Sequence, residues 1–282
     1  MALFSDILLT VDFDRTLTAP DATIPARNIE AIRYFMENGG AFTVNTSRSI
    51  PMSMANILGV VPTNAPLLLY NGSAAYDDQE DKLTRSSSIG FDPSQVLPAL
   101  QEKFPQLNVE IQAVDAHYLM KKNPKWEAYC SNNGCPWKYA APGEIPGPFL
   151  KFAIYSEFLD ANVSSLYTVI PEDRELFEQA LCYIEETYGE YVDVFRSCPR
   201  LADIHTKGVS KLESARLLQK ELGRKILVCV GDAENDLPML EGADYAFCPS
   251  DGSIADRFPN VCPCADGAVA DVIYHELPKI LG

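Results

Sequence analysis

The sequence ILLTVDFDRTLT, residues 7–18, joins an apolar run to two closely spaced acids. Residues 6–13 are β-branched and apolar without a helical period, which is typical of a buried parallel strand. Asp12 and Asp14 come at the end of this run, and side chains two positions apart on a strand point to the same side. Because open α/β sheets bind ligands at the carboxyl ends of their strands, this stretch predicts a fold class and the place of a site.

The two acids need a compensating charge. Two carboxylates at about 4 Å repel each other by about 4 kcal/mol at an effective dielectric of about 20. A hard divalent cation with oxygen ligands is the simplest way to offset this repulsion. Taken alone, the pair has a second interpretation, in which one acid caps a turn and the other is solvated.

Strands and helices alternate along the N-terminal part of the chain. Residues 25–40 have Pro25 at the expected first position, apolar residues at helical spacing and two glycines at the end. Residues 41–46 and 66–77 are typical of strands, and a further helix is predicted between them over residues 51–58. This alternation predicts an α/β fold, a Rossmann-like parallel sheet with helices on both faces.

The middle of the chain has another character. From about residue 77 to residue 200, prolines, aromatic residues and short alternating runs dominate. The βα alternation then resumes with a predicted helix over 210–223 and a predicted strand over 225–232. We therefore expect a core that is interrupted by an inserted α+β domain, with residues 1–83 and 201–282 in the core and 84–200 in the insert.

Charge and composition limit the partners and the compartment. The chain has 39 acidic residues against 23 Lys and Arg, so its net charge of −16 disfavours nucleic acid and anionic membranes as partners. The first residues lack the basic segment of a signal peptide, and no apolar run reaches the length of a membrane helix, which predicts a cytoplasmic protein. Eight cysteines without a C-x-x-C pair favour reduced thiols. For Cys262 and Cys264, residues of a short strand are favoured over a metal pair.

A second acidic cluster repeats the pattern of the first. VCVGDAENDLPML, residues 228–240, places Asp232 directly after a predicted buried strand. Asn235 and Asp236 follow beside a predicted helix start, because Pro238 suits a first turn. A capping acid in a loop explains one of these polar residues but not a pattern that occurs twice. The repetition strengthens the prediction of a cation site.

Two further polar residues are candidates for binding an anion. Ser210 and Glu213 have the spacing of a capping box, which places Lys211 in the first turn of a helix, where the helix dipole disfavours a cation. A bound anion would account for a lysine there, while a solvated surface lysine is the alternative and Lys207 is a rival cation. Thr46 offers a hydroxyl at a third strand end, where a simple cap is the alternative.

Together these residues resemble the four motifs of the haloacid dehalogenase (HAD) superfamily of phosphohydrolases, in its Cof-type branch. The first motif, D-x-D-x-T, corresponds to residues 12–16, and the second to Thr46 of Thr-Ser-Arg. The third corresponds to Lys211 of Gly-Val-Ser-Lys, and the fourth, G-D-x-x-N-D, to residues 231–236. The resemblance implies a HAD-type core and a large α/β cap, formed by the insert, which closes over the site and selects the leaving group.

The resemblance also implies a role for each motif residue. Asp12 would be the nucleophile that takes the phosphoryl group, and Asp14 would protonate the leaving alcohol and then activate water. Mg²⁺ would be held by Asp12, Asp232 and Asp236 and by Asp14, through its backbone carbonyl. Phosphate and substrate binding is implied for residues of several loops: Thr46, Ser47, Arg48, Asn71, Gly72, Lys211 and Asn235.

The implied function is that of a Mg²⁺-dependent phosphomonoester hydrolase acting on a small phosphorylated metabolite such as a sugar phosphate, as a monomer or small homo-oligomer. Within enzymes, a phosphomutase of the same superfamily is the alternative. From another class, a phosphoacceptor regulatory protein also combines clustered Asp, Thr and Lys residues around Mg²⁺. Chain length, the D-x-D on the first strand and the insert argue against that class.

The chain departs from the family pattern in three places. Arg15 stands where the first motif usually has Gly, and Ser47 stands for the middle Gly of T-G-R. AFCPSDG, residues 246–252, replaces the Met-Gly-Asn-Ala turn of the branch. None of these changes affects the four motif side chains, so they bear on substrate contacts and not on the chemistry.

Overall fold

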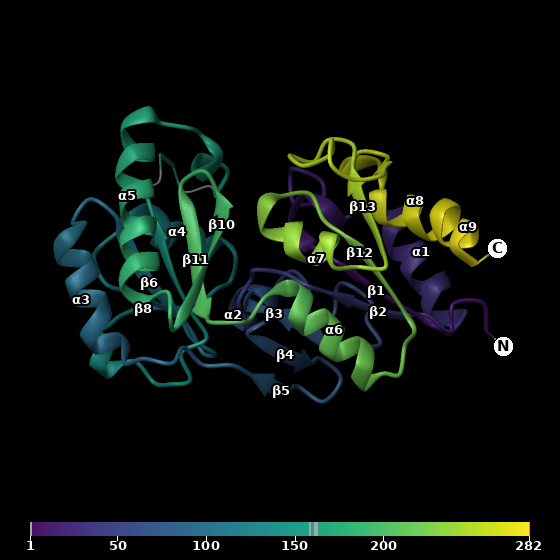
Figure 1. Ribbon diagram of the computed structural model, residues 1–282, viewed down its shortest axis with the longest axis horizontal. Coiled ribbons are helices and arrows are strands. Elements are labelled where there is room, and N and C mark those ends of the chain that lie inside the picture. Colours follow the sequence, from purple (N-terminus) through teal and green to yellow (C-terminus); the bar gives the residue numbers. More distant parts are fainter. Residues whose placement is uncertain (1, 158, 161–162, 282) are drawn as a thin grey trace. The chain divides into compact units, whose positions relative to one another are not determined.

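The computed structural model describes residues 2–157, 159–160 and 163–281, and the chain forms two compact units (Figure 1). The first unit comprises Met1–Thr46, Gly59–Arg85 and Ser210–Gly282. The second comprises Ser47–Leu58 and Ser86–Val209. In the described part of the chain, no helix combines the length and the hydropathy that a membrane crossing requires.

The first unit is built on a five-stranded sheet in which every neighbouring pair is parallel. In spatial order its strands are β14 (Asn260–Val261), β13 (Tyr245–Pro249), β12 (Ile226–Val230), β1 (Ile7–Val11) and β2 (Ala41–Val44). All residues of β1 are buried, as expected for a central parallel strand. The α/β fold predicted from the alternation of strands and helices is confirmed.

Helices pack against this sheet. α1 (Ala26–Glu37) contacts β2 and α8 (Ala268–Asp271), and α6 (Lys211–Glu221) contacts β12 and α7 (Leu237–Glu241). The C-terminal segment ends in α9 (Leu277–Leu281). Side chains from β1, α6 and β12, among them Leu8, Leu218 and Leu227, share one apolar core. A further three-stranded sheet has the order β3 (Leu67–Leu69), β4 (Ala74–Asp77) and β5 (Lys82–Ser86), and β3 pairs with β4 in antiparallel orientation.

The second unit is an α+β domain with its own six-stranded sheet. In spatial order the strands are β10 (Val192–Cys198), β11 (Leu201–Thr206), β9 (Lys151–Tyr155), β6 (Asn108–Gln112), β7 (His117–Leu119) and β8 (Trp137–Tyr139). Its helices are α2 (Ile50–Ser53), α3 (Pro93–Lys103), α4 (Pro124–Asn132) and α5 (Pro171–Tyr188). The pairs are antiparallel except for β7 with β8, which is parallel.

The two faces of this second sheet differ in chemistry. Alternate residues such as Ile111, Ile154 and Ile204 join an apolar core with Leu97 of α3 and Phe177 of α5. The residues between them on the same strands are polar and yet buried: Glu110, Gln112, Lys151, Asp203 and His205. Because side chains alternate along a strand, these polar residues share the face opposite to the apolar core.

The unit boundaries differ from those expected from sequence. Residues 201–209 lie in the second unit and not in the core, because β11 pairs with both β10 and β9 of the second sheet. Residues 47–58 also belong to the second unit.

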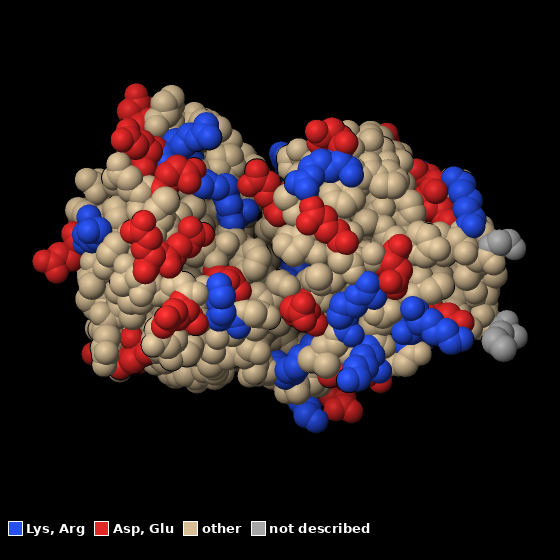
Figure 2. Space-filling view, in the orientation of Figure 1, with Lys and Arg blue, Asp and Glu red and all other residues tan. Residues whose placement is uncertain are grey.

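On the face of the molecule in view, acidic and basic side chains are interspersed (Figure 2).

Candidate active site

Three buried carboxylates meet at the carboxyl ends of two adjacent parallel strands. Asp12 follows β1 and Asp232 follows β12, and Val11 is paired with Val230 in the register of these strands. The Asp12 N–H donates to the Val230 carbonyl over 2.9 Å, which continues the ladder to the site. Together with Asp236, these acids bring one carboxylate oxygen each to within 4.8 Å of one another. The strand ends therefore bring these three acids together.

Lys211 is the cation of this cluster. It is the first residue of α6, and its Nζ lies 2.6 Å from Asp12 Oδ1 and 2.6 Å from Asp236 Oδ1. The Ser210 hydroxyl accepts a hydrogen bond from the Glu213 N–H over 3.2 Å, so the predicted N-terminal cap is present. The rival Lys207 is exposed and its Nζ lies 2.5 Å from Asp193 Oδ1.

The fourth motif and Thr16 hold the acids in place. Thr16 Oγ1 donates to Asp232 Oδ1 over 3.0 Å. Asp236 Oδ2 accepts from the backbone N–H groups of Asp232, over 3.0 Å, and Ala233, over 3.2 Å. One oxygen of Asp236 is thus fixed by its own loop, while the other contacts Lys211. Lys211 thus orients Asp12 and Asp236, and Thr16 orients Asp232.

Burial of several acids together changes their acidity. Burial raises the pKa of Asp12 to about 7, with Asp236 and Asp14 acting in the same direction and Lys211 opposing them. Burial, Asp12 and Asp236 raise the pKa of Asp232 well above its usual range. Burial alone would lower the pKa of Lys211, but Asp12 and Asp236 raise it above its ordinary value. The Lys211 ammonium therefore lies in a cluster in which burial makes Asp12 and Asp232 hard to ionise.

This donor set fits Mg²⁺. Magnesium takes oxygen ligands, and carboxylates are its usual protein ligands. Asp12 and Asp232, whose pKa values are raised by burial and by neighbouring acids, would ionise more readily once a divalent cation offset their charge. Asp12, Asp232 and Asp236 are the residues that would hold the ion.

Thr46 and the turn at Asn71 lie beside the helix that carries Lys211. The Thr46 carbonyl accepts from the Asn71 N–H over 2.9 Å. Gly72, with φ of +99°, approaches Ser210 so closely that a Cβ at this position would lie 2.4 Å from the Ser210 carbonyl oxygen. Gly72 therefore allows the turn to pack on the start of α6.

The other predicted residues are placed less directly. Asp14 is half-buried in the loop after β1, and Asn235 is half-buried in a short turn before α7. Ser47 and Arg48 are counted with the second unit. There the Lys151 Nζ donates to the Ser47 carbonyl over 2.8 Å, and the Arg48 side chain is buried.

Two positioning residues carry roles that sequence reasoning did not assign. Thr16 orients Asp232, and the spacing D-x-D-x-T was its only signal. Asn45 Nδ2 donates to the Lys211 carbonyl over 2.8 Å. No local pattern marks Asn45, because its partner lies 166 residues away in the sequence.

Comparison with known proteins matches the chain to one family and to proteins of similar length. The family model described as haloacid dehalogenase-like hydrolase matches residues 9–255, which include all four motifs. The chain is 22% identical over 251 residues to 5-amino-6-(5-phospho-D-ribitylamino)uracil phosphatase YitU of Bacillus subtilis (strain 168), covering 87% of each chain.

Solved structures share the fold across nearly the whole chain. A haloacid dehalogenase-like hydrolase from Bacteroides thetaiotaomicron aligns with a TM-score of 0.76 at 18% identity, over 94% of this chain and 97% of that one. A structure described as a sugar phosphatase of HAD subclass IIB aligns with a TM-score of 0.74 at 17% identity, over 95% of this chain and 98% of that one. At these identities the likeness establishes the fold.

Proposed function

Since the chain belongs to the family of haloacid dehalogenase-like hydrolases, as its motifs predicted, we propose that it is a Mg²⁺-dependent phosphatase that works through an aspartyl phosphate on Asp12. The observation that carries the proposal is the cluster in which Lys211 Nζ contacts both Asp12 and Asp236. A carboxylate oxygen of Asp232 lies within 4.8 Å of an oxygen of each of these acids, so one metal ion could bind all three. An attacking carboxylate, a cation beside it and a set of magnesium ligands are the parts that phosphoryl transfer needs.

Asp12 is the nucleophile of this proposal. Its carboxylate oxygen forms a bond to phosphorus as the bond from phosphorus to the leaving alcohol breaks. Asp12, Asp232, Asp236 and the Asp14 carbonyl would hold Mg²⁺, which would supply positive charge for the phosphoryl oxygens. Lys211 adds a second positive charge at the same place and keeps Asp12 oriented.

Asp14 moves the protons. It gives a proton to the leaving alcohol in the first step, and then takes one from the water that attacks phosphorus in the second step. The second step releases inorganic phosphate and regenerates the Asp12 carboxylate. Asp14 suits this exchange because it is half-buried, whereas Asp12 is buried and paired with Lys211.

The substrate of the proposal is a small phosphorylated metabolite such as a sugar phosphate. Two observations support this class: the names of the relatives, one a phosphatase of a phosphorylated ribityl compound and one a sugar phosphatase, and the presence of a separate α+β unit that can act as a cap. Phosphate and substrate contacts are assigned to a set of loop residues: Thr46, Ser47, Arg48, Asn71, Gly72, Lys211 and Asn235. We infer that the protein acts in the cytoplasm, as a monomer or small homo-oligomer.

Release of phosphate from p-nitrophenyl phosphate tests the proposal. With Mg²⁺ present we expect continuous turnover by the wild type, and a loss of at least about a thousandfold in Asp12→Asn. The matched control is Asp256→Asn, which changes an exposed acid and should retain the wild-type rate. EDTA should abolish turnover, and added Mg²⁺ should restore it. Full activity in Asp12→Asn contradicts the mechanism.

The same assay separates the alternatives. A phosphoacceptor regulatory protein would be labelled about once per chain and would release no continuing phosphate. A phosphomutase would convert one sugar phosphate into its isomer without net release of phosphate. A screen of sugar phosphates, nucleotides and cofactor phosphates for phosphate release then identifies the substrate class.

A further inference from the structure

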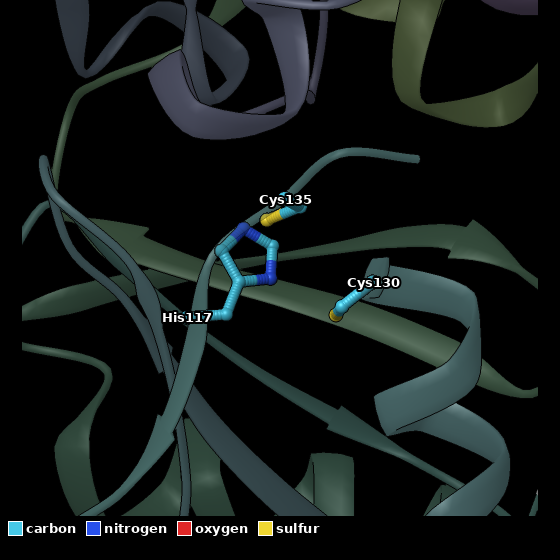
Figure 3. Close-up of side chains that lie close together, drawn as sticks. All are labelled: His117, Cys130 and Cys135. Carbon is cyan, nitrogen blue, oxygen red and sulfur yellow. The ribbon is translucent and has the colours of Figure 1, made fainter. Parts of the chain in front are cut away.

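The second unit contains a cluster of soft metal-ligand residues that phosphoryl transfer does not use. His117 from β7, Cys130 from α4 and Cys135 from the following loop are all buried. One ligand atom from each lies within 4.8 Å of the others. Figure 3 shows the side chains of Cys130 and Cys135 beside the imidazole ring of His117. All three residues belong to the same compact unit.

The end of α4 brings the two cysteines together. The Cys135 N–H donates to the Cys130 carbonyl over 2.8 Å, and the Gly134 N–H donates to the Ser131 carbonyl over 3.1 Å. Gly134 has a φ of +65°, so these bonds form a Schellman motif with glycine at its left-handed position. An apolar contact between the residues at the positions of Cys130 and Cys135 often accompanies this motif. The motif therefore accounts for the two sulfur atoms, but not for a histidine beside them.

His117 brings a polar group that the helix end does not require. Its Nε2 lies 2.7 Å from Ser49 Oγ. Its Nδ1 is buried without a hydrogen-bond partner among the described residues, and Glu110 Oε1 lies 3.6 Å away. Each ring nitrogen thus has an oxygen atom nearby. Whichever nitrogen binds a metal, the other can be held by Ser49 or Glu110, as is usual for metal-ligating histidines.

Glu110 is itself fixed in the cluster. Gln112 Nε2 donates to its Oε1 over 2.6 Å, and the indole N–H of Trp126 donates to its Oε2. A fully buried carboxylate next to a buried imidazole and two thiols is costly without a cation. His117 and Lys151 lie near enough to lower the pKa of Glu110, but Lys151 already pairs with Asp203 over 2.9 Å. A cation bound by the imidazole and the two thiols would add positive charge beside Glu110.

We propose that His117, Cys130 and Cys135 bind a zinc-class divalent cation in the second unit. Two thiolates and an imidazole form a ligand set that selects zinc over magnesium, because Mg²⁺ takes oxygen ligands. In a tetrahedral zinc site with Zn–S of about 2.3 Å and Zn–N of about 2.0 Å, ligand atoms lie about 3.5–3.8 Å apart. Closing the present separations, which are at most 4.8 Å, to this value takes about 1 Å of side-chain movement.

The acidity of the thiols agrees with this ligand set. A hydrogen bond from Cys130 and the neighbouring His117 lower the pKa of Cys135 to about 5, although burial acts in the opposite direction. A thiolate is the form in which cysteine binds a metal. Binding releases the proton that remains on Cys130 and leaves two thiolates on the cation.

Measurements on the wild-type chain test the proposal without any variant. Protein purified with zinc and then dialysed against excess Mg²⁺ should retain about one zinc per chain. Zinc X-ray absorption should show two sulfur neighbours at about 2.3 Å and lighter atoms at about 2.0 Å. Cobalt(II) in place of zinc should give sulfur-to-cobalt charge-transfer absorption. Zinc bound with only oxygen and nitrogen neighbours overturns the proposal.

Cysteine variants locate the site. In Cys130→Ser and Cys135→Ser, zinc affinity should fall at least about tenfold and the charge-transfer band should weaken or vanish. Cys182→Ser is the matched control, because Cys182 is exposed on α5, and it should bind like the wild type. Circular dichroism checks that each variant is folded. Unchanged zinc binding in a folded Cys135→Ser variant overturns the proposal, as does a Cys130–Cys135 disulfide in protein isolated without reductant.

Discussion

The two side-chain clusters of this chain differ in the origin of their geometry. In the first unit, Asp12 and Asp232 meet because β1 and β12 are adjacent parallel strands, although the residues lie far apart in sequence. In the second unit, Cys130 and Cys135 meet because a local helix end folds back on itself. Sheet topology assembles oxygen ligands in one unit, and a turn assembles sulfur ligands in the other.

The two clusters also differ in the groups that offset their buried negative charge. Lys211 is built into the first cluster and contacts two of its acids, so part of the charge is balanced by the chain itself. The second cluster has buried Glu110 and two thiols, with His117 beside them, while the nearby Lys151 is paired with Asp203. The ligands offered to a metal cation are hard carboxylate oxygen atoms in the first unit and soft cysteine sulfur atoms in the second.

The largest expected effect comes from removing the built-in cation of the first cluster. Lys211→Met should lower the rate of phosphate release by about a hundredfold to a thousandfold, because it removes a charge beside the transferring phosphoryl group. It should also destabilise the metal-free protein by about 3 kcal/mol, because Asp12 and Asp236 lose their buried partner. Steady-state kinetics and urea unfolding in EDTA measure the two effects.

Lys207→Met is the control for this variant. Lys207 is exposed and contacts Asp193, so its loss should change the rate and the unfolding free energy little. If Lys207→Met lost activity and Lys211→Met did not, the rival lysine would be the functional one. That outcome would break the assignment of Lys211 to the site.

The next effect tests whether the two clusters bind different metals. Mg²⁺ should raise the thermal stability of the wild type and of Cys135→Ser, but not of Asp232→Asn. Zinc should stabilise the wild type and Asp232→Asn, and Cys135→Ser should lose this response. At a metal concentration about 100 times the dissociation constant, each site should contribute about 2.7 kcal/mol. Calorimetry measures the changes in thermal stability. If both variants responded in the same way to both metals, the two clusters would not be separate sites for different metals.

The pH dependence of metal binding should also differ between the clusters. Burial raises the pKa of Asp12 in the folded protein to about 7, above the unfolded value of about 3.9. Between these values folding of the metal-free chain takes up a proton, so the folded state loses stability as pH rises from about 4 to 7. Mg²⁺ must displace these protons, so its affinity should rise with pH between 5 and 7, by at most about tenfold per unit for each proton. Isothermal titration measures this slope, and an affinity that is flat over this range contradicts the raised pKa of Asp12.

The zinc cluster should keep a steeper dependence above neutral pH. The hydrogen bond to Cys135 and burial raise the pKa of Cys130 above its usual range, so zinc must displace a thiol proton even at pH 8. Zinc affinity should therefore continue to rise from pH 7 to pH 8. Titration with a competing chelator measures it, and a plateau below pH 7 would show that both thiols are already ionised.

The sequence predicted the first cluster better than the second, for a physical reason. Apolar strands followed by acids, as at Asp12 and Asp232, mark sheet edges that parallel pairing must bring together. The family and the α/β fold were predicted on these grounds and are confirmed. The catalytic and ligand roles of the site residues stay predictions until the variants are measured.

What the sequence missed depends on long-range pairing. Residues 201–209 were expected in the core, but they belong to the second unit, where β11 pairs with β9. The residues of a short strand such as β11 do not indicate which sheet it joins. His117 comes close to the two cysteines only in the folded unit, where β7 lies beside the end of α4. The spacing of the three residues in the sequence therefore does not predict the cluster. The contact of Thr16 with Asp232 likewise joins two loops that only the folded sheet brings together.

The smallest expected effect concerns Arg15, the residue that departs from the family pattern next to Asp14. Arg15 has a φ of +60°, in the left-handed region that costs a non-glycine residue about 1–2 kcal/mol. Glycine would relieve this cost but lose about 0.5–1 kcal/mol to its greater freedom in the unfolded chain. We therefore expect Arg15→Gly to stabilise the protein by at most about 1.5 kcal/mol in urea unfolding.

Ala22→Gly is the matched control for this last prediction. Ala22 is exposed and has a φ of +66°, so the same substitution there carries a similar backbone change and removes only a methyl group. The difference between the two variants in unfolding free energy then reports what the Arg15 side chain itself contributes. Equal stabilisation assigns the whole effect to the backbone. A destabilised Arg15→Gly beside a stabilised Ala22→Gly would mean that the Arg15 side chain stabilises the loop after β1, and that arginine replaced glycine there for its contacts.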